Sequence, residues 1–140
     1  MSALDSCLLC SSATVCTECL NVTCLTSSSV CETCSKHIPR CIICSSCNLC
    51  NECDNSSFLA PGGTACLLCS LGMVGCVTCT SSTFCLSCVD DRYYLDLDDK
   101  CHGCGEESDH CKTCMKDLNS SDFTCFSCVS LAYFLNETSS

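Results

Sequence analysis

Hydrophobic and polar positions alternate over short stretches of the chain and follow no sustained helical period. The stretch "RYYLDLDDK" (92–100) shows this alternation and lies between two cysteines. Such a stretch predicts a β-hairpin rather than a helix. The segments "CLSCVDDRYYL" (85–95), "CFSCVSLAYFL" (125–135) and "CNECDNSSFL" (50–59) share the same ending, polar residues followed by an aromatic residue and a leucine. The pattern therefore predicts several small hairpins with little or no helix.

The cysteines between these stretches recur with a period of 35 residues. Six positions of the middle segment repeat when 35 is added to each, and they are Cys31, Cys34, Cys41, Cys44, Cys50 and Cys53, which map onto Cys66, Cys69, Cys76, Cys79, Cys85 and Cys88. Four recur once more, as Cys101, Cys104, Cys111 and Cys114. The last pair, Cys125 and Cys128, comes five residues late, after an insertion at 115–124. Because fixed-period repeats stack on one another, we expect an elongated array of hairpin modules.

The period divides the chain into four segments. We expect an abbreviated first repeat at 7–30, a second repeat at 31–65, a third at 66–100 and a fourth, with the insertion, at 101–140. The first segment has two interpretations. Its pairs Cys7/Cys10 and Cys16/Cys19 lie within a residue of the last two pairs of an earlier unit, or they open an abbreviated unit that starts at Cys7.

Composition explains what holds such repeats together. Cysteine accounts for 24 of the 140 residues, tryptophan is absent and aromatic residues are 6%. This cysteine content is typical of a disulfide scaffold. Thin hairpins bury too little apolar surface to offset the entropy of ordering about 35 residues, so we expect the cross-links to be the framework of each repeat.

The repeated Cys-x2-Cys pairs have two further interpretations. Thiol–disulfide catalysis requires a low-pKa thiol on a thioredoxin-like scaffold, which eleven pairs without helices do not fit. Zinc sites usually separate their pairs by about 12 to 20 residues, whereas the gaps here are five and six residues. The three histidines recur at no fixed repeat position. We therefore expect disulfides, no metal and no cofactor.

Charge and motifs exclude several classes of function. The net charge is −10, with six Lys and Arg against 16 Asp and Glu, so nucleic acid is not an expected partner. No apolar run approaches 18 residues, and the start "MSALDSC" lacks the features of a signal peptide. No catalytic constellation is present, so we do not expect an enzyme. The acidic stretch 90–99 lacks the rest of a calcium loop and predicts a solvated turn.

Four Asn-x-Ser/Thr sequons favour a secreted protein with disulfides, in an oxidising compartment. Asn55, Asn119 and Asn136 lie in long cysteine-free stretches where a glycan has room, whereas Asn21 lies in a short gap between cysteines. The alternative is that all four are ordinary polar loop residues. We expect glycans, with Asn21 the weakest candidate.

The spacing Cys-x2-Cys-x6-Cys-x2-Cys-x5-Cys-x-Ser-Cys, followed by "YYL" and a further cysteine, resembles the furin-like, growth-factor-receptor-type cysteine-rich repeat. The tandem, Ser/Thr-rich form is most similar to cysteine-rich surface proteins of protists such as ciliates. The resemblance covers nearly all of 7–135. It implies hairpin modules in which disulfides connect successive cysteine pairs.

The resemblance also implies a pairing for most of the cysteines. The implied disulfides are Cys10–Cys19, Cys16–Cys24, Cys34–Cys44, Cys41–Cys50, Cys53–Cys66, Cys69–Cys79, Cys76–Cys85, Cys88–Cys101, Cys104–Cys114 and Cys111–Cys125. Ser27 stands where the first unit should have its hairpin cysteine, which leaves Cys31 to pair with the extra Cys47. Cys7 and Cys128 remain, and we expect them to bond outside the chain or to another copy of it.

A structural role follows as the leading hypothesis for function. The chain would be a stiff, protease-resistant, glycosylated rod in a cell coat, surface antigen or extracellular filament. It would associate head to tail or continue into adjacent repeats of a longer chain. Two alternatives remain open: a receptor- or ligand-type protein-binding module, whose docking site would be the insertion at 115–124, and a metal-thiolate protein.

Overall fold

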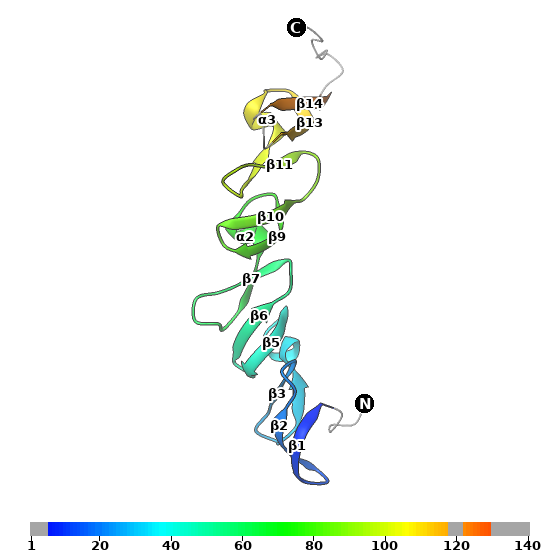
Figure 1. Ribbon diagram of the computed structural model, residues 1–140, viewed down its shortest axis with the longest axis vertical. Helices are drawn as coiled ribbons and strands as arrows, with labels where there is room; N and C mark the ends of the chain where they lie inside the picture. Colours follow the sequence, from blue (N-terminus) through cyan, green and yellow to red (C-terminus); the bar gives the residue numbers. More distant parts are fainter. Residues whose placement is uncertain (1–5, 118–121, 130–140) are drawn as a thin grey trace. The chain divides into compact units, whose positions relative to one another are not determined.

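The computed structural model describes residues 6–117 and 122–129 of the chain. Within these residues, fourteen short strands form seven two-stranded antiparallel hairpins, accompanied by three helices of one turn each (Figure 1). They divide into two compact units, a first unit that ends at Leu68 and a second unit that begins at Cys69. The predicted disulfide-rich array of small hairpins with little helix is confirmed.

Four of the seven hairpins are long, and each begins and ends at a cysteine. They are β1–β2 (Cys7–Ser12 and Val15–Cys19), β5–β6 (Cys41–Ser46 and Leu49–Cys53), β9–β10 (Cys76–Ser81 and Phe84–Cys88) and β13–β14 (Cys111–Lys116 and Phe123–Cys128). The first and last cysteines lie opposite each other, as do the two inner ones. Between these pairs the register shifts, and such bulges bend a strand and change the face on which its side chains lie.

A short hairpin follows each of the first three long ones. The three are β3–β4 (Thr23–Leu25 and Cys31–Thr33), β7–β8 (Ser57–Leu59 and Cys66–Leu68) and β11–β12 (Tyr93–Leu95 and Cys101–Gly103). The middle residue of the first strand is buried in every case: Cys24, Phe58 and Tyr94. The stretch "RYYLDLDDK" thus supplies strand β11 and the turn after it.

Each short hairpin leads into a helical turn: α1 (Cys34–His37), α2 (Cys69–Gly72) and α3 (Cys104–Glu107). The first residue of each turn is a cysteine that is 1% exposed. The residue just before the next long hairpin has a left-handed backbone, with φ of 70° at Arg40, 78° at Gly75 and 96° at His110. The carbonyl of that residue accepts a hydrogen bond from the amide that follows the long hairpin. This bond closes the base of the hairpin.

Replacing Gly75 with alanine will lower the unfolding free energy of the second unit by about 2 kcal/mol or more, since a left-handed non-glycine residue is strained. A Cβ at this position would also lie 2.6 Å from Cδ1 of Tyr93, which would have to move. All three tyrosines belong to the second unit, so denaturant unfolding followed by tyrosine fluorescence measures the loss. Gly105→Ala is the matched control, because its Cβ would meet only the Cys111 carbonyl oxygen at 4.0 Å. Equal losses in both variants would contradict the argument.

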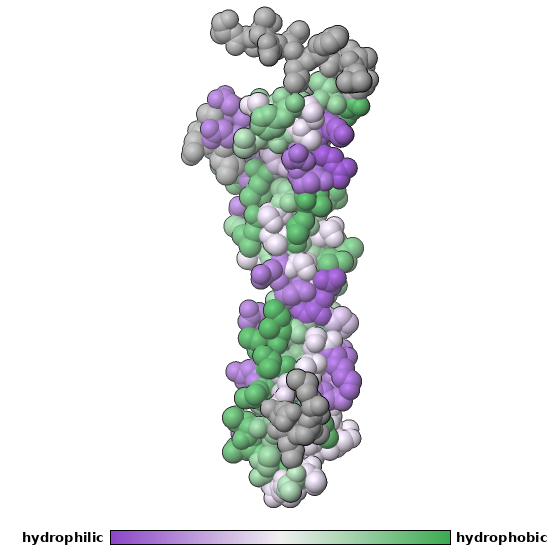
Figure 2. All heavy atoms as spheres, turned by 90° about the vertical axis from the view of Figure 1, so that its right-hand side faces the viewer, coloured by the Kyte–Doolittle hydropathy of each residue, from purple (hydrophilic) through white to green (hydrophobic). Residues whose placement is uncertain are grey.

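The buried interior of these hairpins consists of cysteine. Among the described residues, all buried hydrophobic side chains except Ile38, Phe58 and Tyr94 belong to cysteines. The six most completely buried side chains are Cys16, Cys34, Cys50, Cys69, Cys85 and Cys104. Many leucines and valines instead reach the surface, interspersed with polar residues on the face shown in Figure 2. Sulfur therefore takes the place that aliphatic side chains hold in an ordinary core.

Candidate functional site

The structure contains eleven disulfides, and ten of them repeat in three kinds. Three turn disulfides tie a helical turn to the next long hairpin: Cys34–Cys44, Cys69–Cys79 and Cys104–Cys114. Four hairpin disulfides cross a long hairpin diagonally: Cys7–Cys16, Cys41–Cys50, Cys76–Cys85 and Cys111–Cys125. Three joining disulfides connect a long hairpin to the following short one: Cys19–Cys31, Cys53–Cys66 and Cys88–Cys101. The eleventh, Cys24–Cys47, has no counterpart.

Three of the implied pairs are wrong: two lie in the first repeat, and the third joins Cys31 and Cys47 of the second. The structure lacks Cys10–Cys19, Cys16–Cys24 and Cys31–Cys47, and it has Cys7–Cys16, Cys19–Cys31 and Cys24–Cys47 instead. The other eight pairs coincide with those that the resemblance implies.

The wrong pairs result from the way in which the first cysteines were aligned with the later repeats, which we call the phase of the first repeat. Residues 7–19 form a complete long hairpin that matches Cys41–Cys53 at an offset of 34, so they are the last two pairs of a unit and not its beginning. The sequence carries a signal for this phase. Five residues separate Cys10 from Cys16, as in the second gap of the second and third repeats, whereas the first gap has six residues in all three later repeats.

The Cys24–Cys47 disulfide replaces an aromatic contact. Cys24 occupies the buried middle position of β3, which Phe58 and Tyr94 hold in the other short hairpins. Cys47 lies in the turn between β5 and β6. The bond therefore fastens the first short hairpin to the tip of the following long hairpin.

In the second unit, Tyr94 connects the corresponding short and long hairpins by packing and a hydrogen bond, and no disulfide takes part. Its ring is stacked on His102 with centroids 5.8 Å apart and meets the edge of Phe123 at 6.0 Å. Its hydroxyl donates a 2.7 Å hydrogen bond to Glu107, which also accepts from Lys116 at 3.2 Å. Burial and this hydrogen bond raise the pKa of Tyr94, while the same bond, followed by that from Lys116, lowers the pKa of Glu107. The group stabilises packing between hairpins and binds nothing else that the structure shows.

Two cysteines are free thiols, and they occupy positions that are bonded elsewhere. Cys10 is exposed and corresponds to Cys44, the long-hairpin partner of a turn disulfide. Cys128 is half-buried and corresponds to Cys53, the long-hairpin partner of a joining disulfide. The expectation that Cys7 is unpaired is wrong, because Cys7 is the first residue of a long hairpin and bonds across it to Cys16.

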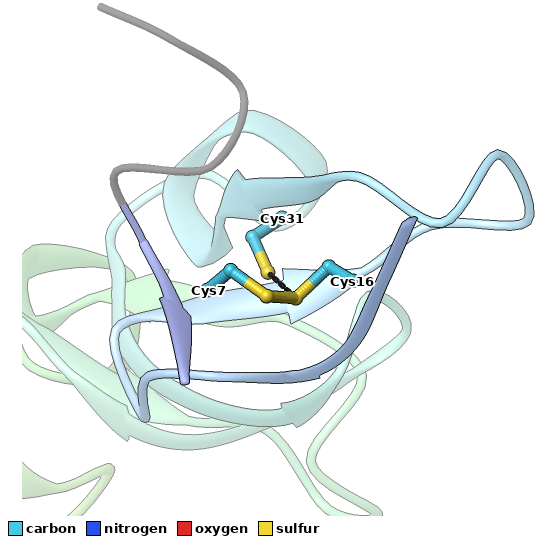
Figure 3. Close-up of side chains that lie close together, drawn as sticks. All are labelled: Cys7, Cys16 and Cys31. Atoms are coloured by element: carbon cyan, nitrogen blue, oxygen red, sulfur yellow. Dashed lines mark hydrogen bonds between the residues drawn. A yellow bond between two sulfur atoms is a disulfide. The ribbon is translucent and has the colours of Figure 1, made fainter. Parts of the chain in front are cut away.

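Sulfur atoms of neighbouring disulfides touch in the first three long hairpins. Figure 3 shows the first of these contacts, in which the Cys31 sulfur lies 3.2 Å from that of Cys16 in the Cys7–Cys16 disulfide. The equivalent separations are 3.6 Å between Cys50 and Cys66 and 3.4 Å between Cys85 and Cys101. Each contact brings a hairpin disulfide against the joining disulfide that follows it.

The described residues contain four groups of three side chains close enough to surround a metal ion. They are Cys7, Cys16 and Cys31; Cys24, His37 and Cys47; Cys41, Cys50 and Cys66; and Cys76, Cys85 and Cys101. Every cysteine in these groups is disulfide-bonded, so none of them is a thiolate ligand. In the acidic stretch 90–99, Asp90 accepts hydrogen bonds from the Arg92 guanidinium at 2.6 and 2.9 Å, and Asp96 lies 3.8 Å from the Lys116 ammonium.

Two of the four sequons lie within the described residues, and both asparagines are exposed. Asn21 lies between β2 and β3, where its carbonyl accepts a hydrogen bond from the Cys44 amide at 3.2 Å. Asn55 lies between β6 and β7. Asn119 and Asn136 lie outside the described residues, as does most of the segment 129–135 that resembles a short-hairpin strand.

No protein-family model, curated protein or solved structure matches the chain. The helices of the described residues have four residues each, whereas crossing a membrane as a helix takes about 20. The site with the most distinctive chemistry is therefore the sulfur framework itself, together with its two free thiols.

Proposed function

We propose that the chain is an extracellular structural protein made of tandem disulfide-linked modules, not an enzyme. The observation that carries this proposal is the interior of the hairpins, whose six most completely buried side chains are all cysteines. Disulfides persist in secreted proteins and on cell surfaces, and they stabilise small folds that lack a sufficient apolar core. The resemblance to furin-like repeats of surface proteins supports the same location.

Within this proposal, Cys10 and Cys128 join the chain to further modules. In the other modules, the residue corresponding to Cys10 bonds to a cysteine of the preceding helical turn. The residue corresponding to Cys128 bonds to a cysteine of the following short hairpin. Cys10 would thus bond to a preceding module and Cys128 to a following one. This correspondence favours partner modules in a longer chain, whereas further copies of this chain, joined head to tail, would pair Cys10 of one with Cys128 of the next. A heterologous contact of this kind forms filaments when its rotation does not close into a ring.

Glycans at the sequons would complete such a surface. Asn55 is exposed and lies in the connection from a long to a short hairpin. We propose glycans at Asn55, Asn119 and Asn136, and less readily at Asn21, whose backbone carbonyl bonds to the next long hairpin.

Mixing purified copies in a glutathione redox buffer will produce a ladder of covalent multimers on non-reducing electrophoresis, because each copy carries two free thiols. Cys10→Ser and Cys128→Ser each remove one partner of the Cys10–Cys128 bond between copies, so each single variant will remain monomeric. The double variant will remain monomeric, and reductant will collapse every band to the monomer.

Peptide mapping of protein from its natural source separates the two kinds of partner. A longer chain predicts that Cys10 and Cys128 are bonded to cysteines outside residues 1–140, and joined copies predict a bond between Cys10 and Cys128. The proposal fails if both thiols alkylate in native material and the parent chain stays monomeric in the redox buffer.

A further inference from the structure

The free thiol of Cys10 lies against a disulfide. Its sulfur is 3.2 Å from the sulfur of Cys7, which is bonded to Cys16. A disulfide bond is about 2.05 Å long, so the two atoms need to approach by only about 1.2 Å to bond. Cys10 is exposed, which allows solvent to remove its proton.

The local backbone explains why these sulfurs meet. In a regular strand, residues i and i+3 point to opposite faces. The register of β1 shifts between Cys7 and Leu9 and again between Leu9 and Cys10. These irregularities bring the Cys7 and Cys10 side chains to the same side, although they lie three residues apart on one strand.

An attack on the Cys7 sulfur would release Cys16, and the Cys16 sulfur lies in a buried site next to two carbonyl oxygens. Cys16 is 1% exposed, and its sulfur lies 3.0 Å from the Glu18 carbonyl oxygen and 3.5 Å from that of Leu9. A carbonyl oxygen accepts a hydrogen bond from a thiol, and burial in such surroundings favours the neutral thiol over the thiolate. A cysteine released at this position would therefore be protonated and unreactive.

From these contacts we propose that the first long hairpin exchanges its disulfide. The Cys10 thiol loses its proton to solvent, and the thiolate forms a bond to the Cys7 sulfur. The Cys7–Cys16 bond breaks, and Cys16 leaves as a thiolate that takes a proton from solvent. One disulfide is broken and one is formed, so the step needs no oxidant or reductant.

After the exchange the hairpin still has one free thiol, but that thiol is now on a different cysteine. With Cys7–Cys16 bonded, the thiol is exposed at Cys10 and available to another protein. With Cys7–Cys10 bonded, the thiol is at Cys16, shielded from solvent and from reagents. The corresponding cysteines of the other modules are held in turn disulfides, so this exchange belongs to the first long hairpin alone among the described modules.

The Cys128→Ser variant, whose only thiol is the exchanging one, tests the proposal. The variant is incubated without reductant between pH 6 and 8.5, quenched with acid, unfolded, alkylated with N-ethylmaleimide in acid and mapped without reduction. We expect about 0.1–10% of the label on Cys16, the share typical of a minor state. The rate of its appearance will rise about tenfold per pH unit below the pKa of the thiol, because the thiolate is the attacking species.

Cys10→Ser is the matched control, because it leaves Cys128 as the only thiol. Among the described residues, Cys128 makes no sulfur contact like that of Cys10 with Cys7, so all label will stay on it. Label confined to Cys10 in the Cys128→Ser variant, at every pH and time, would overturn the proposal. Label on Cys19 would also overturn it, because the thiol would then have passed through Cys16 to the Cys19–Cys31 disulfide instead of remaining there.

Discussion

Removing the Cys24–Cys47 disulfide will lower the unfolding free energy of the first unit by about 3.5 kcal/mol. This bond joins residues 23 positions apart, the largest separation among the eleven disulfides. In the chain-entropy account, a closed loop of this length restricts the unfolded chain by about that amount. The change is Cys24→Ala with Cys47→Ser, which also avoids leaving one reactive thiol. Amide hydrogen exchange measured by mass spectrometry will show the loss in β3–β4 and β5–β6.

An aromatic residue should recover part of this loss. Cys24→Tyr with Cys47→Ser places in β3 the residue that occupies the same buried position in β11. Burying such a side chain contributes roughly 2 kcal/mol, so this variant will be more stable than the alanine one. The first unit has no tyrosine or tryptophan of its own, so the new residue also provides a fluorescent probe of unfolding. A tyrosine variant no more stable than the alanine variant would show that the two contacts are not interchangeable.

Removing a hairpin disulfide from the second unit will have an effect of similar size. Cys76→Ala with Cys85→Ala opens a loop with a sequence separation of 9, worth about 2.6 kcal/mol. It also leaves a void, because the two side chains are 3% and 1% exposed and the Cys85 sulfur lies 3.4 Å from that of Cys101 in the next disulfide. Tyrosine fluorescence in a denaturant series measures the loss.

The control for this variant is Cys128→Ala, which removes a cysteine of the same unit that has no disulfide. Its denaturation midpoint should move little, because neither a cross-link nor a fully buried side chain is lost. A shift as large as that of the double variant would mean that local packing, and not the cross-link, determines the stability of the unit.

Constant spacing made most of the framework predictable. A helical turn, a long hairpin and a short hairpin recur with the cysteines, and the eight pairs from Cys34 onward that the resemblance implies are those in the structure. Cys47 lies outside this pattern. Its partner Cys24 stands at a position where the pattern shows an aromatic residue, so no repeat offers a template for the bond.

The sulfur contacts around Cys10 could not be predicted from the sequence, for a different reason. The contact between Cys7 and Cys10 depends on bulges in β1, and the cysteine spacing alone does not specify a bulge. The exposed state of Cys10 follows from the phase of the first hairpin, which the gap of five residues before Cys16 indicates. Spacing thus predicts which cysteines correspond, whereas strand geometry decides which sulfurs meet.

The placement of the disulfides has a genetic consequence. Residues 69–103 contain both partners of Cys69–Cys79, Cys76–Cys85 and Cys88–Cys101, and no disulfide leaves this segment. A deletion or duplication of this stretch by unequal recombination would therefore leave every other cysteine with its original partner. Chains of this design can change in length between generations by whole modules without creating an orphan thiol, so copy number is free to vary while the pairing rule is preserved.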